Sequence, residues 1–83
     1  MKMLSYCEAD NAKFYIGLKA RGEDFETMLN HLRTSVPVSE RTFNREQKYW
    51  EIDANPTNEA TLRRLFPEFG ERLDTIRAQL HLF

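Results

Sequence analysis

Cysteine, glycine and proline are scarce in this chain of 83 residues, and the scarcity excludes two classes of protein. The single cysteine, Cys7, cannot form a disulfide within the chain, which fits a reducing compartment and leads us to expect a cytoplasmic protein. The three glycines, Gly17, Gly22 and Gly70, are isolated from one another, so there is no glycine-rich phosphate-binding loop. The sequence therefore predicts neither a disulfide scaffold nor a nucleotide hydrolase.

Long apolar runs and a strong charge of one sign are missing as well. No run approaches the roughly 20 apolar residues of a membrane-spanning helix, so we expect no membrane partner. The net charge of −1 gives no overall basic signature for nucleic acid. The charge is unevenly placed, however: residues 11–50 carry seven basic and five acidic side chains (+2), and residues 51–83 carry four and six (−2). Any nucleic-acid surface is therefore expected in the first half of the chain.

Residues that carry catalysis or hold metals are sparse. Cys7 and His31 could form a nucleophile–base pair, but a lone cysteine is more often an incidental buried thiol. His31 and His81 together with one cysteine do not supply the four ligands of a structural zinc site. We therefore expect no enzyme, no metal, no cofactor and no small-molecule substrate.

Alternation of apolar and polar residues predicts strands in three places. Lys13–Arg21 alternates cleanly with period two, as a half-buried strand does. Weaker alternation in Met1–Tyr6 predicts a short strand before it, with a turn over Cys7–Ala12. The segment Arg41–Asp53 is typical of a tight β-hairpin with the polar tip Asn44–Gln47.

Three other segments have the spacing of helices. Apolar residues repeat at helical intervals in Phe25–Val36, and Pro37 ends that pattern. A second helix is predicted from an N-cap within Asn55–Asn58 to Phe66. Pro67 ends it or opens the next one, an amphipathic helix over residues 68–81.

These elements predict one α+β domain spanning residues 1–83. Their order is β-β-α-β-β-α followed by an extra C-terminal helix. A small antiparallel sheet covered on one face by helices is the natural two-layer arrangement of such elements. The other face of the sheet would be open to solvent or to a partner.

The Arg41–Asp53 hairpin concentrates aromatic residues beside basic ones. Three of the ten aromatic residues, Phe43, Tyr49 and Trp50, lie within eight positions. Alternation places Trp50 with Ile52 toward the core and Tyr49 on the opposite face. Such side chains on a sheet can stack bases and bind phosphates, and they can equally form the core of a small domain.

Two functions follow from these patterns, both without catalysis. The first is binding of nucleic acid, single-stranded or forked DNA, through the open sheet face and the hairpin. Its candidate residues are Lys13, Tyr15, Lys19, Arg21, Arg41, Arg45, Lys48 and Tyr49. The second is a protein-interaction or inhibitor module, or a homodimer, that uses the C-terminal helix. Its candidate residues are Leu73, Ile76, Leu80, Leu82 and Phe83, for which packing on the sheet is the alternative.

The element order and the pattern Arg41-Thr-Phe43 followed by Lys48-Tyr-Trp-Glu-Ile52 resemble the HARP domain, a small module that accompanies annealing helicases. The resemblance covers residues 4–69. It implies a structural role for the tryptophan and its aromatic partner, and binding of structured or forked DNA. This chain has no motor domain, is less basic than the family pattern, and continues past the pattern after Pro67.

Overall fold

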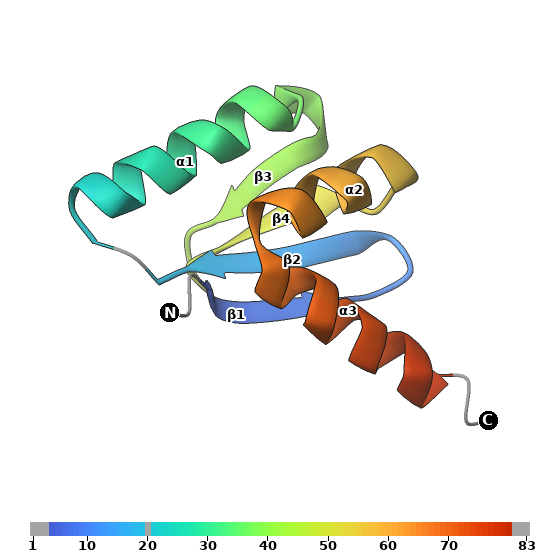
Figure 1. The fold of residues 1–83 in the computed structure, drawn as a ribbon. Coiled ribbons are helices and arrows are strands. Elements are labelled where there is room, and N and C mark those ends of the chain that lie inside the picture. The colour runs from blue at the N-terminus through green and yellow to red at the C-terminus, as the bar shows by residue number, and fades with distance from the viewer. Residues whose placement is uncertain (1–3, 20, 81–83) are drawn as a thin grey trace.

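The computed structural model describes residues 4–19 and 21–80 and confirms the predicted α+β fold (Figure 1). The elements are β1 (Leu4–Ala9), β2 (Lys13–Leu18), α1 (Glu23–Ser35), the short 3-10 helix η1 (Val38–Glu40), β3 (Arg41–Asn44), β4 (Tyr49–Asp53), α2 (Pro56–Leu65) and α3 (Pro67–Leu80). The predicted start of the first strand at residues 1–3, the predicted end of the last helix at residue 81 and the candidate residues Leu82 and Phe83 lie outside the described residues.

The sheet joins two β-hairpins side by side. Its strand order is β1-β2-β4-β3, and each neighbouring pair is antiparallel. Phe14 and Ile16 from β2 and Ile52 from β4 face the helices. Buried residues of α1, α2 and α3 complete the same core, so the helices share one face of the sheet and leave the other open.

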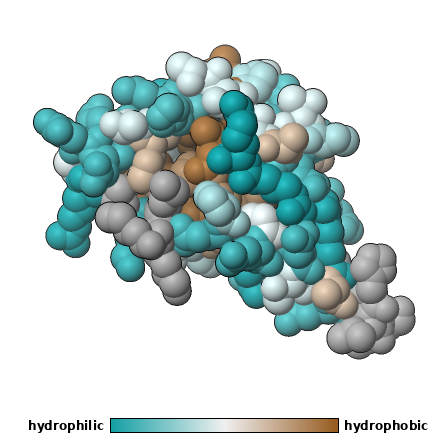
Figure 2. Space-filling view, viewed as in Figure 1, coloured by the Kyte–Doolittle hydropathy of each residue, from teal (hydrophilic) through white to brown (hydrophobic). Residues whose placement is uncertain are grey.

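The core uses most of the large apolar side chains. Its buried members are Leu4, Phe14, Ile16, Leu32, Val36, Ile52, Leu62, Phe66, Phe69 and Leu73. Figure 2 shows that hydrophilic side chains surround the apolar ones on the side from which the helices are seen. Ile52 is buried as the alternation predicts. Trp50 is only half-buried, and its ring lies 5.2 Å from that of Phe43, which is 41% exposed, so these two rings form the margin of the core.

The first strand differs from its prediction, because β1 continues to Ala9 where a turn was expected. Cys7 and Glu8 pair with Ile16 and Tyr15 of β2, and this pairing overrides their weak strand preference. The turn between β1 and β2 is therefore shorter than predicted and covers residues 10–12. Asp10 Oδ1 accepts the backbone N–H groups of Ala12 and Lys13 at 2.8 and 2.7 Å, which closes the turn in the manner typical of aspartate.

Local capping sets the ends of the helices. Gly22 precedes α1 with a φ of 63°, a left-handed conformation that glycine adopts without strain. Asn55 caps α2, and its side chain accepts the backbone N–H of Asn58 at 2.8 Å. The break at Phe66 has extended backbone, and Pro67 then opens α3.

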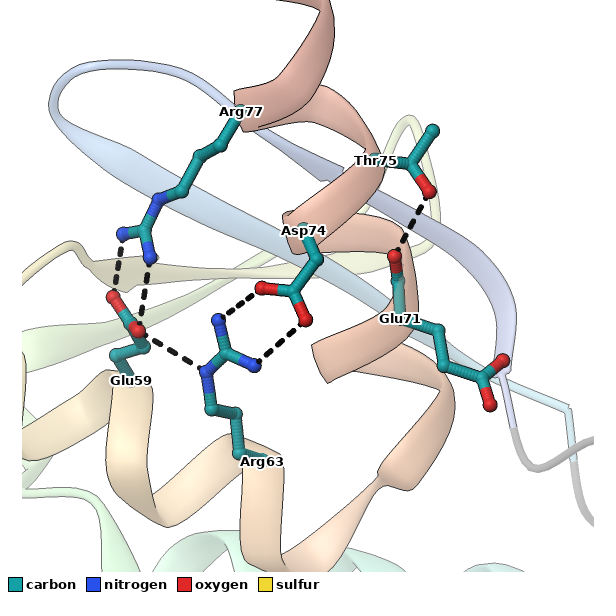
Figure 3. Close-up of polar contacts among 6 residues, drawn as sticks. All are labelled: Glu59, Arg63, Glu71, Asp74, Thr75 and Arg77. Carbon is teal, nitrogen blue, oxygen red and sulfur yellow. Dashed lines mark hydrogen bonds and ion pairs between the residues drawn. The ribbon is translucent and has the colours of Figure 1, made fainter.

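Ion pairs hold α3 against α2 (Figure 3). Arg63 Nη2 lies 2.7 Å from Asp74 Oδ1, and Arg63 Nε lies 3.1 Å from Glu59 Oε2. Arg77 contributes two hydrogen bonds to Glu59, at 3.0 and 2.5 Å. The hydrogen bonds from Arg77 and from Arg63 hold the pKa of Glu59 below its ordinary value.

None of the helices within residues 4–19 and 21–80 has both the length and the apolar character needed to cross a membrane.

Candidate nucleic-acid interface

The open face of the sheet carries three tyrosines from three strands. Tyr15 alternates with the buried residues Phe14 and Ile16 of β2 and so projects to the open side. Tyr6 of β1 is paired with Gly17. Continuing the β2–β4 register by one residue beyond Ile16 and Trp50 places Tyr49 opposite Gly17 on the other side. Gly17 therefore lies between Tyr6 and Tyr49.

The two tyrosines lean toward each other across Gly17. Neighbouring strands are about 4.8 Å apart, so side chains standing upright on β1 and β4 would be separated by roughly 10 Å. The ring centroids of Tyr6 and Tyr49 are only 5.1 Å apart, and the planes differ by 14°. The ring of Tyr15 meets that of Tyr49 edge-on at 5.4 Å. We call Tyr6, Tyr15 and Tyr49 the tyrosine platform.

A glycine at position 17 makes this arrangement possible. A Cβ atom there would lie 2.8 Å from Ser5 Oγ, which is too close for an undisturbed contact, and 3.1 Å from Tyr6 Cβ, which is tighter than ordinary van der Waals contact. Glycine inside a strand weakens the strand and often marks a close approach. The covering of the glycine by aromatic rings offsets that weakness.

The three tyrosines of the platform differ in their hydrogen bonds and in their exposure to solvent. The hydroxyl of Tyr15 donates to Asp10 Oδ2 at 2.5 Å, and this hydrogen bond raises the pKa of Tyr15 to about 12. Desolvation raises the pKa of Tyr49 as well. Tyr6 is 44% exposed, and the other two rings are half-buried. Tyr15 and Tyr49 are therefore neutral near pH 7, Tyr15 is held in place by its hydrogen bond, and Tyr6 is accessible.

Two of the predicted phosphate-binding residues are occupied by contacts within the fold. Lys13 Nζ lies 2.6 Å from Asp53 Oδ1, so the charge of this lysine is largely balanced. Arg41 pairs with Ile52 and thus belongs to the helix-covered side of β3. Its guanidinium donates to the backbone carbonyls of Val36 and Arg33 at the end of α1, where a cation is favoured.

The other four predicted basic residues gather at one end of the sheet. Lys19 and Arg21 follow the end of β2, while Arg45 and Lys48 lie in the turn that precedes β4. Because β2 and β4 are antiparallel, the end of one lies beside the start of the other. All four side chains are exposed. We call these four residues the basic end.

The β3–β4 turn that carries two of them has a defined shape. Asn44 Oδ1 accepts the backbone N–H groups of Glu46 and Gln47 at 3.1 and 3.0 Å. Lys48 adopts a φ of 64°, and its N–H donates to Asn44 O at 2.8 Å. Arg45 and Lys48 therefore project from a hydrogen-bonded turn immediately before Tyr49.

The opposite end of the open face is acidic. Glu51 lies beside Tyr15 in the register and accepts a hydrogen bond from Asn44 Nδ2 at 3.1 Å. Asp10 and Asp53 lie close to the β1–β2 turn, where they bind Tyr15 and Lys13. Glu51 and Asp10 would repel a phosphate chain there, so approach to the tyrosine platform from the basic end is favoured.

The residues predicted for a protein interface are divided by the structure. Leu73 is 3% exposed and packs in the core, on the sheet side of α3. Ile76 is half-buried at a cavity of about 340 Å³ whose floor includes Phe14. The side chain of Leu80 and the residues Leu82 and Phe83 lie outside the described part.

Two observations on the described residues concern metal binding and the thiol of Cys7. No three histidine, cysteine, aspartate or glutamate side chains among residues 4–19 and 21–80 come together in a way that could hold a metal ion. Burial, with a smaller effect of Glu8, raises the pKa of the Cys7 thiol to about 11, so little reactive thiolate forms.

The sequence pattern missed two members of the interface. Tyr6 belonged to a weakly alternating segment, and Gly17 looked like an ordinary polar-face position in a strand. The available signal was the glycine itself, since glycine within a strand points to close approach of other groups.

No known protein family matches this chain, and neither a curated protein nor a solved structure is significantly similar to it.

Proposed function

We propose that this protein is a non-catalytic module that binds single-stranded nucleic acid, with DNA at a fork or gap as the natural target. The observation that carries the proposal is the tyrosine platform beside the basic end on an open sheet face. Sheets whose open face carries aromatic residues are a common way of stacking unpaired bases. Cytoplasmic location and HARP-like handling of DNA belong to the same proposal.

Bases and phosphates would be bound by different parts of this surface. The exposed face of Tyr6 offers a stacking surface, and each stacked base is worth roughly 1–3 kcal/mol. Lys19, Arg45 and Lys48 would neutralise phosphates on the basic side of the stack. The acidic side chains Glu51 and Asp10 would disfavour the strand at the far end and so favour its approach from the basic end.

Salt dependence tests the proposed surface. Each phosphate contact with a single strand contributes roughly 0.7 to the slope of log K against log salt concentration, so Arg45→Glu/Lys48→Glu should reduce the slope by about 1.4. Arg33→Glu/Arg64→Glu is the matched control, since both arginines are exposed and lie on helices α1 and α2. A labelled oligothymidine and a labelled fork should be titrated at several salt concentrations.

The two double variants change the net charge by the same amount. If both weaken binding and reduce the slope equally, the oligonucleotide senses only overall charge, and the basic end is not the contact surface. Absence of binding by the wild-type protein at about 100 μM in low salt would refute the function itself.

A further inference from the structure

We infer that a bound single strand crosses the sheet at right angles to the β-strands and occupies about four nucleotides at most. This inference rests on the proposed function and deepens it, because it names the substrate as a short unpaired stretch rather than a long single strand. The observations that carry it are the order of the residues on the open face and the positions of the charges beside them.

The side chains of the open face form rows that run from strand to strand. The first row places Tyr6 opposite Gly17 and Tyr49 opposite Asn44, and so takes one residue from each of the four strands. It lies next to the basic end, because β2 ends and β4 begins there. The rings of Tyr6 and Tyr49 are stacked, and Tyr6 is exposed, so this row offers the stacking surface for bases.

Basic side chains follow the first row across three neighbouring strands. Lys19 lies just past the end of β2, Lys48 just before β4 and Arg45 just after β3. Each is exposed and lies within two positions of the row residue of its own strand. The strand order places β4 between β2 and β3. A phosphate chain that contacts all three cations therefore has to cross these strands, since a path along one strand leaves the other two cations behind.

A second row lies further from the basic end and carries carboxylates. It contains Glu8 opposite Tyr15, and Tyr15 opposite Glu51. Glu8 is paired with Arg72 at 2.5 Å and so adds little net charge. Glu51 accepts its hydrogen bond from a neutral side-chain amide at 3.1 Å, so its negative charge is retained. Side chains on one face of a strand are roughly 7 Å apart, so a phosphate chain that followed the strands would soon meet Glu51.

The β1–β2 turn closes the same path beyond Tyr15. Asp10 accepts hydrogen bonds from the hydroxyl of Tyr15 and from two backbone N–H groups, all of them neutral donors. These hydrogen bonds hold the pKa of Asp10 below its ordinary value, so its carboxylate is charged at neutral pH. A nucleic-acid strand that ran along β2 would meet Glu51 and then Asp10, whereas one that crosses the sheet along the first row avoids both.

The width of the sheet sets the length of the bound stretch. Four strands at a spacing of about 4.8 Å place the two outer strands roughly 14 Å apart. Consecutive phosphates of a stacked strand advance by about 3.4 Å, so the first row spans about four nucleotides, and fewer if the strand is stretched. A short gap or the junction of a fork supplies an unpaired stretch of this length.

Oligothymidines of four, eight and sixteen nucleotides measure the footprint. A four-nucleotide site has five registers on the eight-nucleotide strand, which should therefore bind about fivefold more tightly than the four-nucleotide strand. A ratio above about tenfold would show a longer footprint and overturn the inference, while the proposed function would stand. Absence of binding by the sixteen-nucleotide strand at about 100 μM in low salt would refute the proposed function, and the inference with it.

The effect of Glu51 on the path can be measured separately. Glu51→Gln removes the charge but keeps an oxygen that accepts from Asn44 Nδ2. The strand is then free to continue past Tyr15, so the ratio of the eight- to the four-nucleotide affinity should rise about twofold or more. Glu26→Gln is the matched control, because it removes the same charge at an exposed position on α1. An unchanged ratio for Glu51→Gln, or an equal rise in both variants, would contradict the inferred path.

Spin labels report the direction of the strand directly. A nitroxide is attached to the 5′ or to the 3′ end of the four-nucleotide strand, which is then bound to ¹⁵N-labelled protein. We expect one label to broaden the amide signals of β1 most strongly and the other label those of β3. Strongest broadening at the β1–β2 turn, residues 10–12, or at the same edge of the sheet by both labels, would overturn the inference.

Discussion

Gly17→Ala is expected to destabilise the protein, although alanine is ordinarily tolerated in a strand. The new Cβ would lie 2.8 Å from Ser5 Oγ and 3.1 Å from Tyr6 Cβ, so one of these side chains must move. Overpacking of this kind costs roughly 1–3 kcal/mol. Alanine also restricts the unfolded chain, which adds roughly 0.4–1 kcal/mol to the free energy of unfolding. The expected net loss is therefore about 1 kcal/mol of the free energy of unfolding.

Urea denaturation followed by the fluorescence of Trp50 measures this loss. Gly70→Ala is the matched control, because Gly70 lies inside α3 and its new Cβ would meet a single side chain, that of Arg63, at 3.2 Å from Nη1 and 3.5 Å from Cγ, with no contact under 3.0 Å. Alanine is favoured over glycine in a helix by about 1 kcal/mol, so this variant should be equally or more stable than the wild type.

A second substitution, Ser5→Ala, tests whether Ser5 Oγ is the atom that the new Cβ displaces. Ser5→Ala removes the Oγ that lies nearest to the new Cβ, so Gly17→Ala should cost less in that background than in the wild type. Displacement of Tyr6 should also disturb its stacking on Tyr49 and weaken oligonucleotide binding. A Gly17→Ala protein as stable as the Gly70→Ala control, with unchanged binding, would refute the close packing described for this position.

Three further predictions concern the side chains of Glu59, Cys7 and Trp50. Glu59→Gln should lower stability by about 1 kcal/mol, because Glu59 accepts from both Arg63 and Arg77 while remaining partly exposed. Since the folded-state pKa of Glu59 is lowered, its contribution is present above the ordinary value of 4.5 and is lost as the pH falls through the folded pKa. Urea midpoints measured from neutral pH down to acid should therefore converge for wild type and variant, and a constant difference would contradict the assignment. Cys7 should react with an aromatic disulfide reagent only slowly at pH 8, since burial raises its pKa to about 11. Fast reaction of the native protein at the rate of the urea-unfolded chain would show that the thiol is exposed. Trp50→Ala should cost about 2 kcal/mol, less than the roughly 3–5 kcal/mol of a fully buried aromatic residue, because Trp50 is half-buried. Complete unfolding of the Trp50→Ala protein on circular dichroism would place that ring in the centre of the core.

Much of the fold could be predicted from local patterns. The alternation that begins at Lys13, the helical spacing in Phe25–Val36 and the stop at Pro37 each predict an element that the structure contains. Strand β2 ends at Leu18, however, three residues before the predicted end at Arg21. The end of β1 at Ala9 could not be predicted, because that segment becomes a strand through its pairing with β2 rather than through its own composition.

The candidate interface was harder to predict than the fold. Alternation correctly separates Tyr49 from Ile52, but it cannot show that Arg41 turns back to the end of α1 or that Asp53 neutralises Lys13. The Lys13–Asp53 contact depends on the strand order, which brings together residues 40 positions apart in the chain. The Arg41 contact depends on how the chain returns from α1 to β3. The stacking of Tyr6 on Tyr49 has the same origin, since their strands are separated by β2.

Binding of a labelled oligothymidine to the variant Tyr6→Ala/Tyr49→Ala tests the central proposal most directly. Its matched control is Tyr6→Phe/Tyr49→Phe, which keeps both rings and removes only the hydroxyl groups. The account predicts that the alanine variant, shown to be folded by circular dichroism, binds about tenfold more weakly or worse, whereas the phenylalanine variant binds like the wild type. Equal binding by a folded alanine variant would contradict the proposal that the tyrosine platform stacks bases.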